Sequence, residues 1–218
     1  MIQSLGIVIW FLMAQIISCW GVFTVKALTD YDWLDQLANA GDIFSTEYML
    51  LVNEVLYPAL LLSDFLIVMP IILKKKEPFC KKISTGSFFY YTGLGLLLNI
   101  VVSVIVDILP TKNYDSLMSV VLTGSPVLIF ILSGIIAPIV EEIVFRYKLI
   151  DILENKYNPR VTLILSSLLF GLAHMNIVQS IYAFFLGIVL GSIYLRKDKS
   201  LLPCIIVHIA INASSILI

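Results

Sequence analysis

The sequence predicts an all-α, polytopic integral membrane protein with about seven transmembrane helices and a cytoplasmic N-terminus. Of its 218 residues, 60% are hydrophobic and only 13% are charged, and the mean hydropathy is +1.00. A soluble domain has roughly 45–50% apolar and about 25% charged residues. The apolar residues form runs of about 20, the length of a spanning helix, and lack the alternating pattern of barrel strands. Lipid must therefore surround much of the surface.

The expected helices follow the apolar runs in order. The first run has no basic segment before it and is too long for the core of a signal peptide, so we expect a retained helix. We expect one membrane domain over residues 1–218, with N-terminal helices in 1–110 and a core in 120–218. The seven runs cover residues 2–25, 48–73, 86–109, 126–150, 160–175, 177–195 and 201–217.

Basic residues set the predicted orientation. With a cytoplasmic N-terminus, the connections near 74–85, 146–160 and 196–199 lie inside. Of the 14 basic residues, all except Lys26 and Lys112 then fall on the inner side. This asymmetry is typical of cytoplasmic loops. We therefore expect a multi-pass protein of the cell membrane with membrane lipids around it.

The remaining composition is less informative. The net charge is −1, which gives no basic surplus for binding nucleic acid, so no nucleic-acid partner is expected. Cys19, Cys80 and Cys204 show no C-x-x-C spacing and are interpreted as reduced thiols without a role.

Polar residues inside the apolar runs are the candidates for function, because a charge at mid-bilayer costs at least about 2.5–3.5 kcal/mol. Two acids of the second run, Glu54 and Asp64, are ten residues apart, and neither is assigned. The full set is Glu54, Asp64, Asp107, Glu141, Glu142, His174, His208 and Asn212.

The fourth run carries a pair of adjacent acids. Glu142 and Arg146 are four residues apart, so they share a helix face in the favourable order for an ion pair. Glu141 lies about 100° around the helix and has no such partner, which leaves its carboxylate available as a general base. Pro138 lacks an N–H and is expected to kink the helix one turn before Glu141.

The fifth and seventh runs supply imidazoles and an amide. Phe170 and His174 share one helix face, and so do His208 and Asn212. An acid, two imidazoles and an amide donor are the groups needed to activate water and to stabilise an oxyanion.

Three motifs together, Glu141-Glu142-x-x-x-Arg146, Phe170-x-x-x-His174 and His208-x-x-x-Asn212, resemble the CAAX protease and bacteriocin-processing (Abi, CPBP) family. The resemblance covers roughly residues 120–218, which would form the catalytic core. It implies a glutamate-dependent, metal-independent intramembrane endopeptidase. The small size and short loops resemble the bacterial branch, which favours a peptide or a membrane-protein segment over a prenylated protein as substrate.

The resemblance also implies roles for individual residues. Glu141 would be the general base, polarising water together with His174. His208 and Asn212 would stabilise the oxyanion, and Glu142 and Arg146 would shape the site. No cofactor is expected.

Three alternatives compete with this interpretation. Two His and a Glu could hold zinc, although H-E-x-x-H is absent. A non-catalytic relative could act by binding, as a bacteriocin immunity factor or as a regulator of a membrane protein. Transport is disfavoured, because no paired interrupted helices occur in two matching halves.

Two expectations concern depth in the membrane. His174 lies further along its helix from the inner side than Glu141 does. The fifth helix must therefore start in the cytoplasm, tilt, or end inside the membrane. Water must also reach the site, so we expect a polar cavity entering from the inner face among the last four helices.

Overall fold

The computed structural model describes residues 2–40, 46–73, 80–109 and 125–217. Every regular element in these ranges is helical, as predicted. The elements are α1 (Ile2–Thr29), α2 (Tyr31–Asn39), α3 (Thr46–Leu73), α4 (Thr85–Ile108), α6 (Pro126–Ile129), the π-helix η1 (Phe130–Ile136), α7 (Ala137–Glu142), the π-helix η2 (Ile143–Ile150), α8 (Asp151–Glu154), α9 (Pro159–Ala173), α10 (Ile177–Arg196) and α11 (Leu201–Leu217).

The helices confirm a multi-pass membrane protein. Within the described ranges, five helices are long and apolar enough to cross a membrane: Leu5–Thr29, Glu47–Leu73, Thr85–Ile108, Pro126–Glu154 and Ile177–Arg196. Two further apolar helices, α9 and α11, have 15 and 17 residues. Each of the seven coincides with a predicted run. At 1.5 Å per residue, α9 is about 22 Å long, which is shorter than the roughly 30 Å of a hydrocarbon core.

Local capping fixes the short α9 and the turn after it. Asn158 caps α9 and is followed by Pro159, which has no N–H to satisfy at a helix start. Asn176 caps α10 by accepting from two backbone N–H groups. Between the two helices, Met175 has a positive φ of 53°, so the chain reverses at once.

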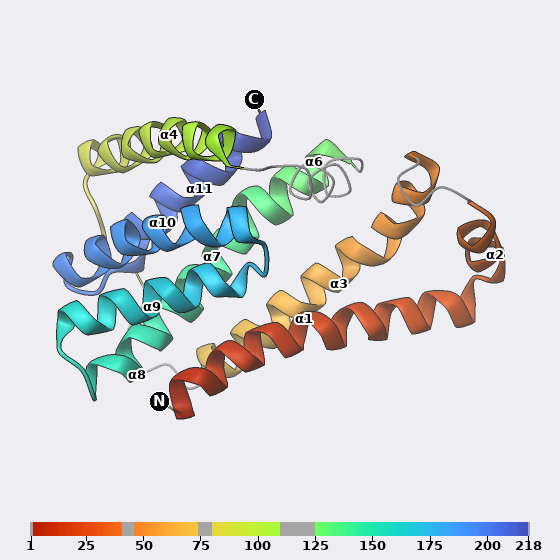
Figure 1. Ribbon diagram of the computed structural model, residues 1–218, viewed down its shortest axis with the longest axis horizontal. Helices are drawn as coiled ribbons and strands as arrows, with labels where there is room; N and C mark the ends of the chain where they lie inside the picture. Colours follow the sequence, from red (N-terminus) through yellow and green to blue (C-terminus); the bar gives the residue numbers. More distant parts are fainter. Residues whose placement is uncertain (1, 41–45, 74–79, 110–124, 218) are drawn as a thin grey trace.

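The stretch 126–154, here called the central helix, contains α6, η1, α7, η2 and α8. Figure 1 shows it between two groups of helices. On one side, α1 and α3 form an antiparallel hairpin that α2 joins at its far end. On the other side, α9 packs on α10, and α4 packs on α11. The central helix contacts both groups, so its side chains can join residues from both halves of the chain.

One apolar core runs through both groups. It includes Phe11 of α1, Ile67 of α3, Phe145 of the central helix and Val207 of α11. A second, smaller cluster lies near α2, where the Trp33 indole N–H donates to the Leu51 carbonyl at 3.1 Å.

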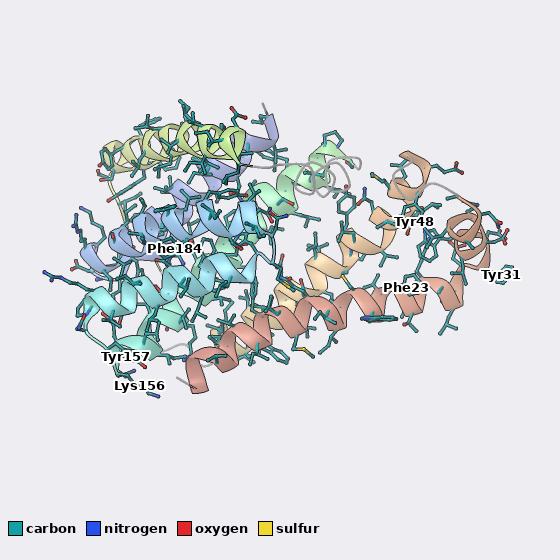
Figure 2. The ribbon with its side chains drawn as sticks, viewed as in Figure 1. Phe23, Tyr31, Tyr48, Lys156, Tyr157 and Phe184 are labelled. Atoms are coloured by element: carbon teal, nitrogen blue, oxygen red, sulfur yellow. The ribbon has the colours of Figure 1, made fainter. Side chains whose placement is uncertain are left out.

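The two ends of the molecule differ as the predicted topology requires. Figure 2 places Lys156, from a predicted inner connection, and Tyr31, from a predicted outer one, at opposite ends. Lys74, Lys75, Lys76 and Lys112, which also entered the topology prediction, lie outside the described residues.

Candidate active site

Glu141 and Glu142 end a short α-helix that lies between two π-helical segments. The helix widens before Pro138. Proline has no N–H, so the carbonyl four residues before Pro138 lacks its usual α-helical donor. The preceding residue, Ala137, bonds instead to the Leu132 carbonyl, five residues back. Where a kink was predicted at Pro138, the chain therefore forms a π-helical segment directly before it. Such segments are frequent at functional sites, since they shift which side chains share a face.

The predicted pair of Glu142 and Arg146 is present, and both side chains are completely buried. The Arg146 Nε and the Glu142 Oε2 are 3.3 Å apart. The Arg146 guanidinium also lies over the Phe170 ring, with its Cζ 4.5 Å from the ring centroid. The ring face offers the cation a favourable electrostatic contact. Arg146 is therefore held by an anion and by an aromatic ring from α9.

His208 connects the two glutamates. Its Nδ1 is 2.9 Å from the Glu142 Oε1, and its Nε2 is 3.6 Å from the Glu141 Oε2. A carboxylate accepts hydrogen bonds only, so Nδ1 is the donor to Glu142. This bond orients the ring and directs Nε2 toward Glu141. Glu141, predicted to lack a partner on its own helix, thus has an imidazole close by from α11.

His174 lies at the C-terminal cap of α9. Its Nδ1 is 2.9 Å from the Phe170 carbonyl oxygen, which can only accept, so Nδ1 carries a proton. In the neutral ring, Nε2 is then the unprotonated, basic nitrogen. Because α9 has 15 residues and is shorter than a bilayer core, a start at the inner face would end the helix inside the membrane, which is one of the three solutions predicted for the depth of His174.

Phe170 links the two histidines. Its ring makes edge contacts with His174 at 5.0 Å and with His208 at 5.9 Å between centroids. It is almost fully buried. Its four-residue spacing from His174 indicated a shared face but not its role at the centre of these contacts.

Asn212 lies one turn beyond His208 on α11. Its amide Nδ2 donates to the Ser133 carbonyl at 3.1 Å, which ties α11 to η1. An amide nitrogen carries two hydrogens, so this bond leaves a second one for a ligand. Ser133 in turn lines a cavity that also contains Glu141.

That cavity has a volume of about 130 Å³, which is room for a few water molecules. Its walls come from α1, α3 and the central helix, and its lining includes Gln15, Asp64, Ser133 and Glu141. The expectation that the cavity lies among the last four helices is therefore wrong. The physical reason is that the α1–α3 hairpin packs directly on the central helix and closes the face that carries Glu141.

A larger cavity of about 800 Å³ lies further toward one end of the same groove. Ile67 and Val144 line it, and each lies three residues beyond a residue of the smaller cavity, Asp64 and Glu141. Its rim carries Lys81, Lys148 and Lys199, all predicted to be cytoplasmic. The two cavities thus follow one another along α1, α3 and the central helix.

Two residues of the small cavity were not assigned from sequence. Asp64 was recognised as an acid inside an apolar run, but the sequence does not fix the rotation of α3 about its own axis. Gln15 is one of several uncharged polar residues in the first run, and a glutamine among them gives little indication of function.

The zinc alternative lacks a complete ligand set. Within the described ranges, no three His, Cys, Asp or Glu side chains are arranged to hold a metal ion. Glu141 and His208 would offer two donors, whereas catalytic zinc normally has three protein ligands.

Comparison with known proteins gives a family match in the C-terminal region. Residues 123–214 match the model of a family described as type II CAAX prenyl endopeptidase, Rce1-like. The matched segment contains Glu141, His174, His208 and Asn212, and it excludes α1 to α4. The chain matches none of the curated proteins and none of the solved structures with which it was compared.

Proposed function

We propose that this chain, whose residues 123–214 match the model of the Rce1-like type II CAAX prenyl endopeptidase family, is an intramembrane endopeptidase in which Glu141 activates water. The observation that carries the proposal is the position of Glu141. Its carboxylate faces a water-sized cavity and has the His208 Nε2 at 3.6 Å. A base needs both access to water and a group that holds it in place.

In the proposed reaction, Glu141 takes a proton from a water molecule while the water oxygen attacks the peptide carbonyl carbon. To His174, whose basic Nε2 lies beside the Phe170 ring that also contacts His208, we assign the part of polarising the water as the substrate binds. A positioned general base typically contributes about 10²–10⁴-fold to the rate.

The developing oxyanion needs hydrogen-bond donors. The second hydrogen of the Asn212 amide is one candidate. The other is the His208 Nε2 in the doubly protonated ring, in which Nδ1 still donates to Glu142. Removing one such donor from an oxyanion hole typically costs about 10²–10³ in kcat. The fully buried Glu142–Arg146 pair would hold His208 in register throughout.

For the substrate, we propose a short peptide or a membrane-protein segment that enters from the cytoplasmic side. The larger cavity supports this route, because α1, α3 and the central helix form part of its wall, as they do in the smaller cavity, and its charged lining residues (Lys81, Lys148, Asp151, Asp198 and Lys199) belong to segments predicted to be cytoplasmic. The many apolar side chains exposed on α1, α3 and α4 support lipid as the surrounding solvent. We place the protein in the cell membrane.

The test is a comparison of the wild type with Glu141→Gln in a host that makes the protein naturally. Membrane-associated and secreted peptides are profiled by mass spectrometry at matched expression. The control is Glu54→Gln, the same change of a carboxylate to an amide in α3 at an exposed site.

A peptide that appears with the wild type and with Glu54→Gln, but not with Glu141→Gln, is expected. It would also give the cleavage site. If all three profiles agree while Glu141→Gln keeps the biological phenotype, the catalytic proposal fails, and the alternative of action by binding takes its place.

Metal independence is tested on the same peptide. We propose that cleavage by the purified protein persists in excess chelator, because no three His, Cys, Asp or Glu side chains of the described residues are placed to hold a metal ion, and Glu141 and His208 alone would offer two donors. A loss of activity that added zinc restores would contradict this.

A further inference from the structure

Asp64 is an acid of the N-terminal half that reaches the candidate active site. It lies on α3, outside the segment that matches the family, and its half-buried side chain lines the 130 Å³ cavity with Glu141. A carboxylate inside an apolar span is costly unless it is paired or has a use. In the described part of the chain, no basic side chain lies within ion-pair distance of Asp64.

Glu54, ten residues earlier on the same helix, shows the contrast. Its carboxylate is 2.7 Å from the Lys26 ammonium, and half of its side chain is exposed. Glu54 is thus neutralised at the end of the hairpin, whereas Asp64 faces another carboxylate. The two acids of α3 carry the same functional group but have different neighbours, a lysine for Glu54 and a carboxylate for Asp64.

Two carboxylates in one small cavity disfavour being charged together, since each charge acts on the other. The surrounding groups do not remove this repulsion. From α1 the cavity receives Gln15, which is neutral. From α11, His208 approaches Glu141 but also bonds to Glu142, whose charge is matched by Arg146. A single proton held between Asp64 and Glu141 relieves the repulsion.

We propose that Asp64 is a second carboxylate of the reaction centre, which shares one proton with Glu141 and delivers it to the leaving amine. The inference rests on the proposed function and extends it. It assigns to the N-terminal hairpin a part in the chemistry, beside its part in forming the cavity wall.

The Glu141 carboxylate takes a proton from water as the water oxygen bonds to the carbonyl carbon, and the C=O pair moves to the oxygen. When C=O re-forms, the C–N bond breaks and its electron pair stays on nitrogen. The nitrogen then receives the proton of Asp64. One peptide bond and one water give one acid and one amine, and the proton now on Glu141 is again shared with Asp64.

The test uses the full-length protein in lipid vesicles and the peptide that the profiling experiment identifies. Asp64→Asn is expected to lower kcat by about 100-fold or more with little change in KM, because general acid catalysis is lost. One limb of the bell-shaped pH dependence of kcat should disappear. Asp64→Glu should restore part of the rate, and Glu54→Gln should behave as the wild type.

The outcomes separate the two proposals. If Glu141→Gln is inactive while Asp64→Asn keeps the wild-type kcat and pH profile, Asp64 has no catalytic part and the proposed function stands. If Glu141→Gln cleaves at the wild-type rate, the proposed function itself fails.

A second measurement does not depend on activity or on the substrate. Infrared difference spectra over a pH titration report the carbonyl stretch of protonated carboxyl groups. The shared proton predicts a wild-type band whose midpoint pH is moved by Asp64→Asn and by Glu141→Gln, but not by Glu54→Gln. A midpoint that neither of the first two substitutions moves would overturn the proposal.

Discussion

The N-terminal hairpin (α1 to α3) and the C-terminal region (residues 126–217) use similar amino acids in different surroundings. In the most apolar windows of α1 and α3, 22% and 28% of the residues are buried, compared with 44% in the central helix and 39% in α10. The hairpin therefore turns most of its apolar surface outward, to lipid. The C-terminal region turns more of it inward, against other helices.

Ion pairs show the same difference. At the outer end of the hairpin, Lys26 lies within 2.8 Å of Asp30 and 2.7 Å of Glu54, and these groups are partly exposed. The hydrogen bond from Lys26 lowers the pKa of Asp30, which lies outside the spans. In the C-terminal region, Glu142 and Arg146 are fully buried. Burial is therefore what distinguishes the ion pairs of Lys26, which anchor a helix end, from the Glu142–Arg146 pair, which forms part of the candidate site.

The largest expected effect is that of Arg146→Met. It leaves the charge of Glu142 in the core without its cation, with only the hydrogen bond from His208, and breaking a buried ion pair in this way typically costs about 3–5 kcal/mol of unfolding free energy. Denaturant unfolding in detergent micelles measures the loss. Lys26→Met, the same change at the exposed pair, should cause no measurable loss, because exposed ion pairs contribute little.

The double variant Glu142→Leu with Arg146→Met sharpens this prediction. With both charges gone, much of the stability should return, although His208 loses its acceptor. Equal losses of unfolding free energy in Arg146→Met and Lys26→Met would contradict the expectation that the buried pair contributes more to stability than the exposed one.

The next effect concerns the contact between α4 and α11. A Cβ at Gly95 would lie 2.5 Å from the Val207 carbonyl oxygen and 2.6 Å from the Ala210 Cβ, next to His208. Gly95→Ala should therefore push α4 from α11 and cost about 1–3 kcal/mol. A Cβ at Gly93, on the same helix, meets nothing within 4 Å, so Gly93→Ala is the matched control. Similar unfolding free energies for both variants would argue against this close contact.

The smallest effect belongs to the hairpin alone. Trp33→Phe removes the hydrogen bond to the Leu51 carbonyl while keeping an aromatic ring in the α2 cluster. The expected loss of unfolding free energy is about 0.5–1.5 kcal/mol. Peptide cleavage should not change, since α2 lies at the end of the hairpin that is remote from α7, the helix that carries Glu141 (Figure 1). A large loss of cleavage would mean that the outer end of the hairpin is coupled to the site.

Hydropathy and charge were sufficient to predict the seven helices, because each apolar run has to pair its own backbone in lipid. Spacing along single helices was sufficient to predict the pair of Glu142 and Arg146. Contacts between helices were not predictable in this way. Whether Asp64 or Glu54 faces Glu141 depends on how α3 is rotated about its axis. The sequence does not show this rotation, because the residues that face lipid and those that face the core are apolar alike. The role of Phe170 likewise depends on rings from three different helices.

The central claim is that Glu141 activates water at a site inside the membrane. The most direct test is cleavage of the identified peptide by purified protein in lipid vesicles made up in oxygen-18 water, with the mass of the new C-terminus as the readout. The account predicts one labelled oxygen in the product of the wild type and a cleavage rate at least about 100-fold lower for Glu141→Gln. Labelled product formed by Glu141→Gln at the wild-type rate would contradict it.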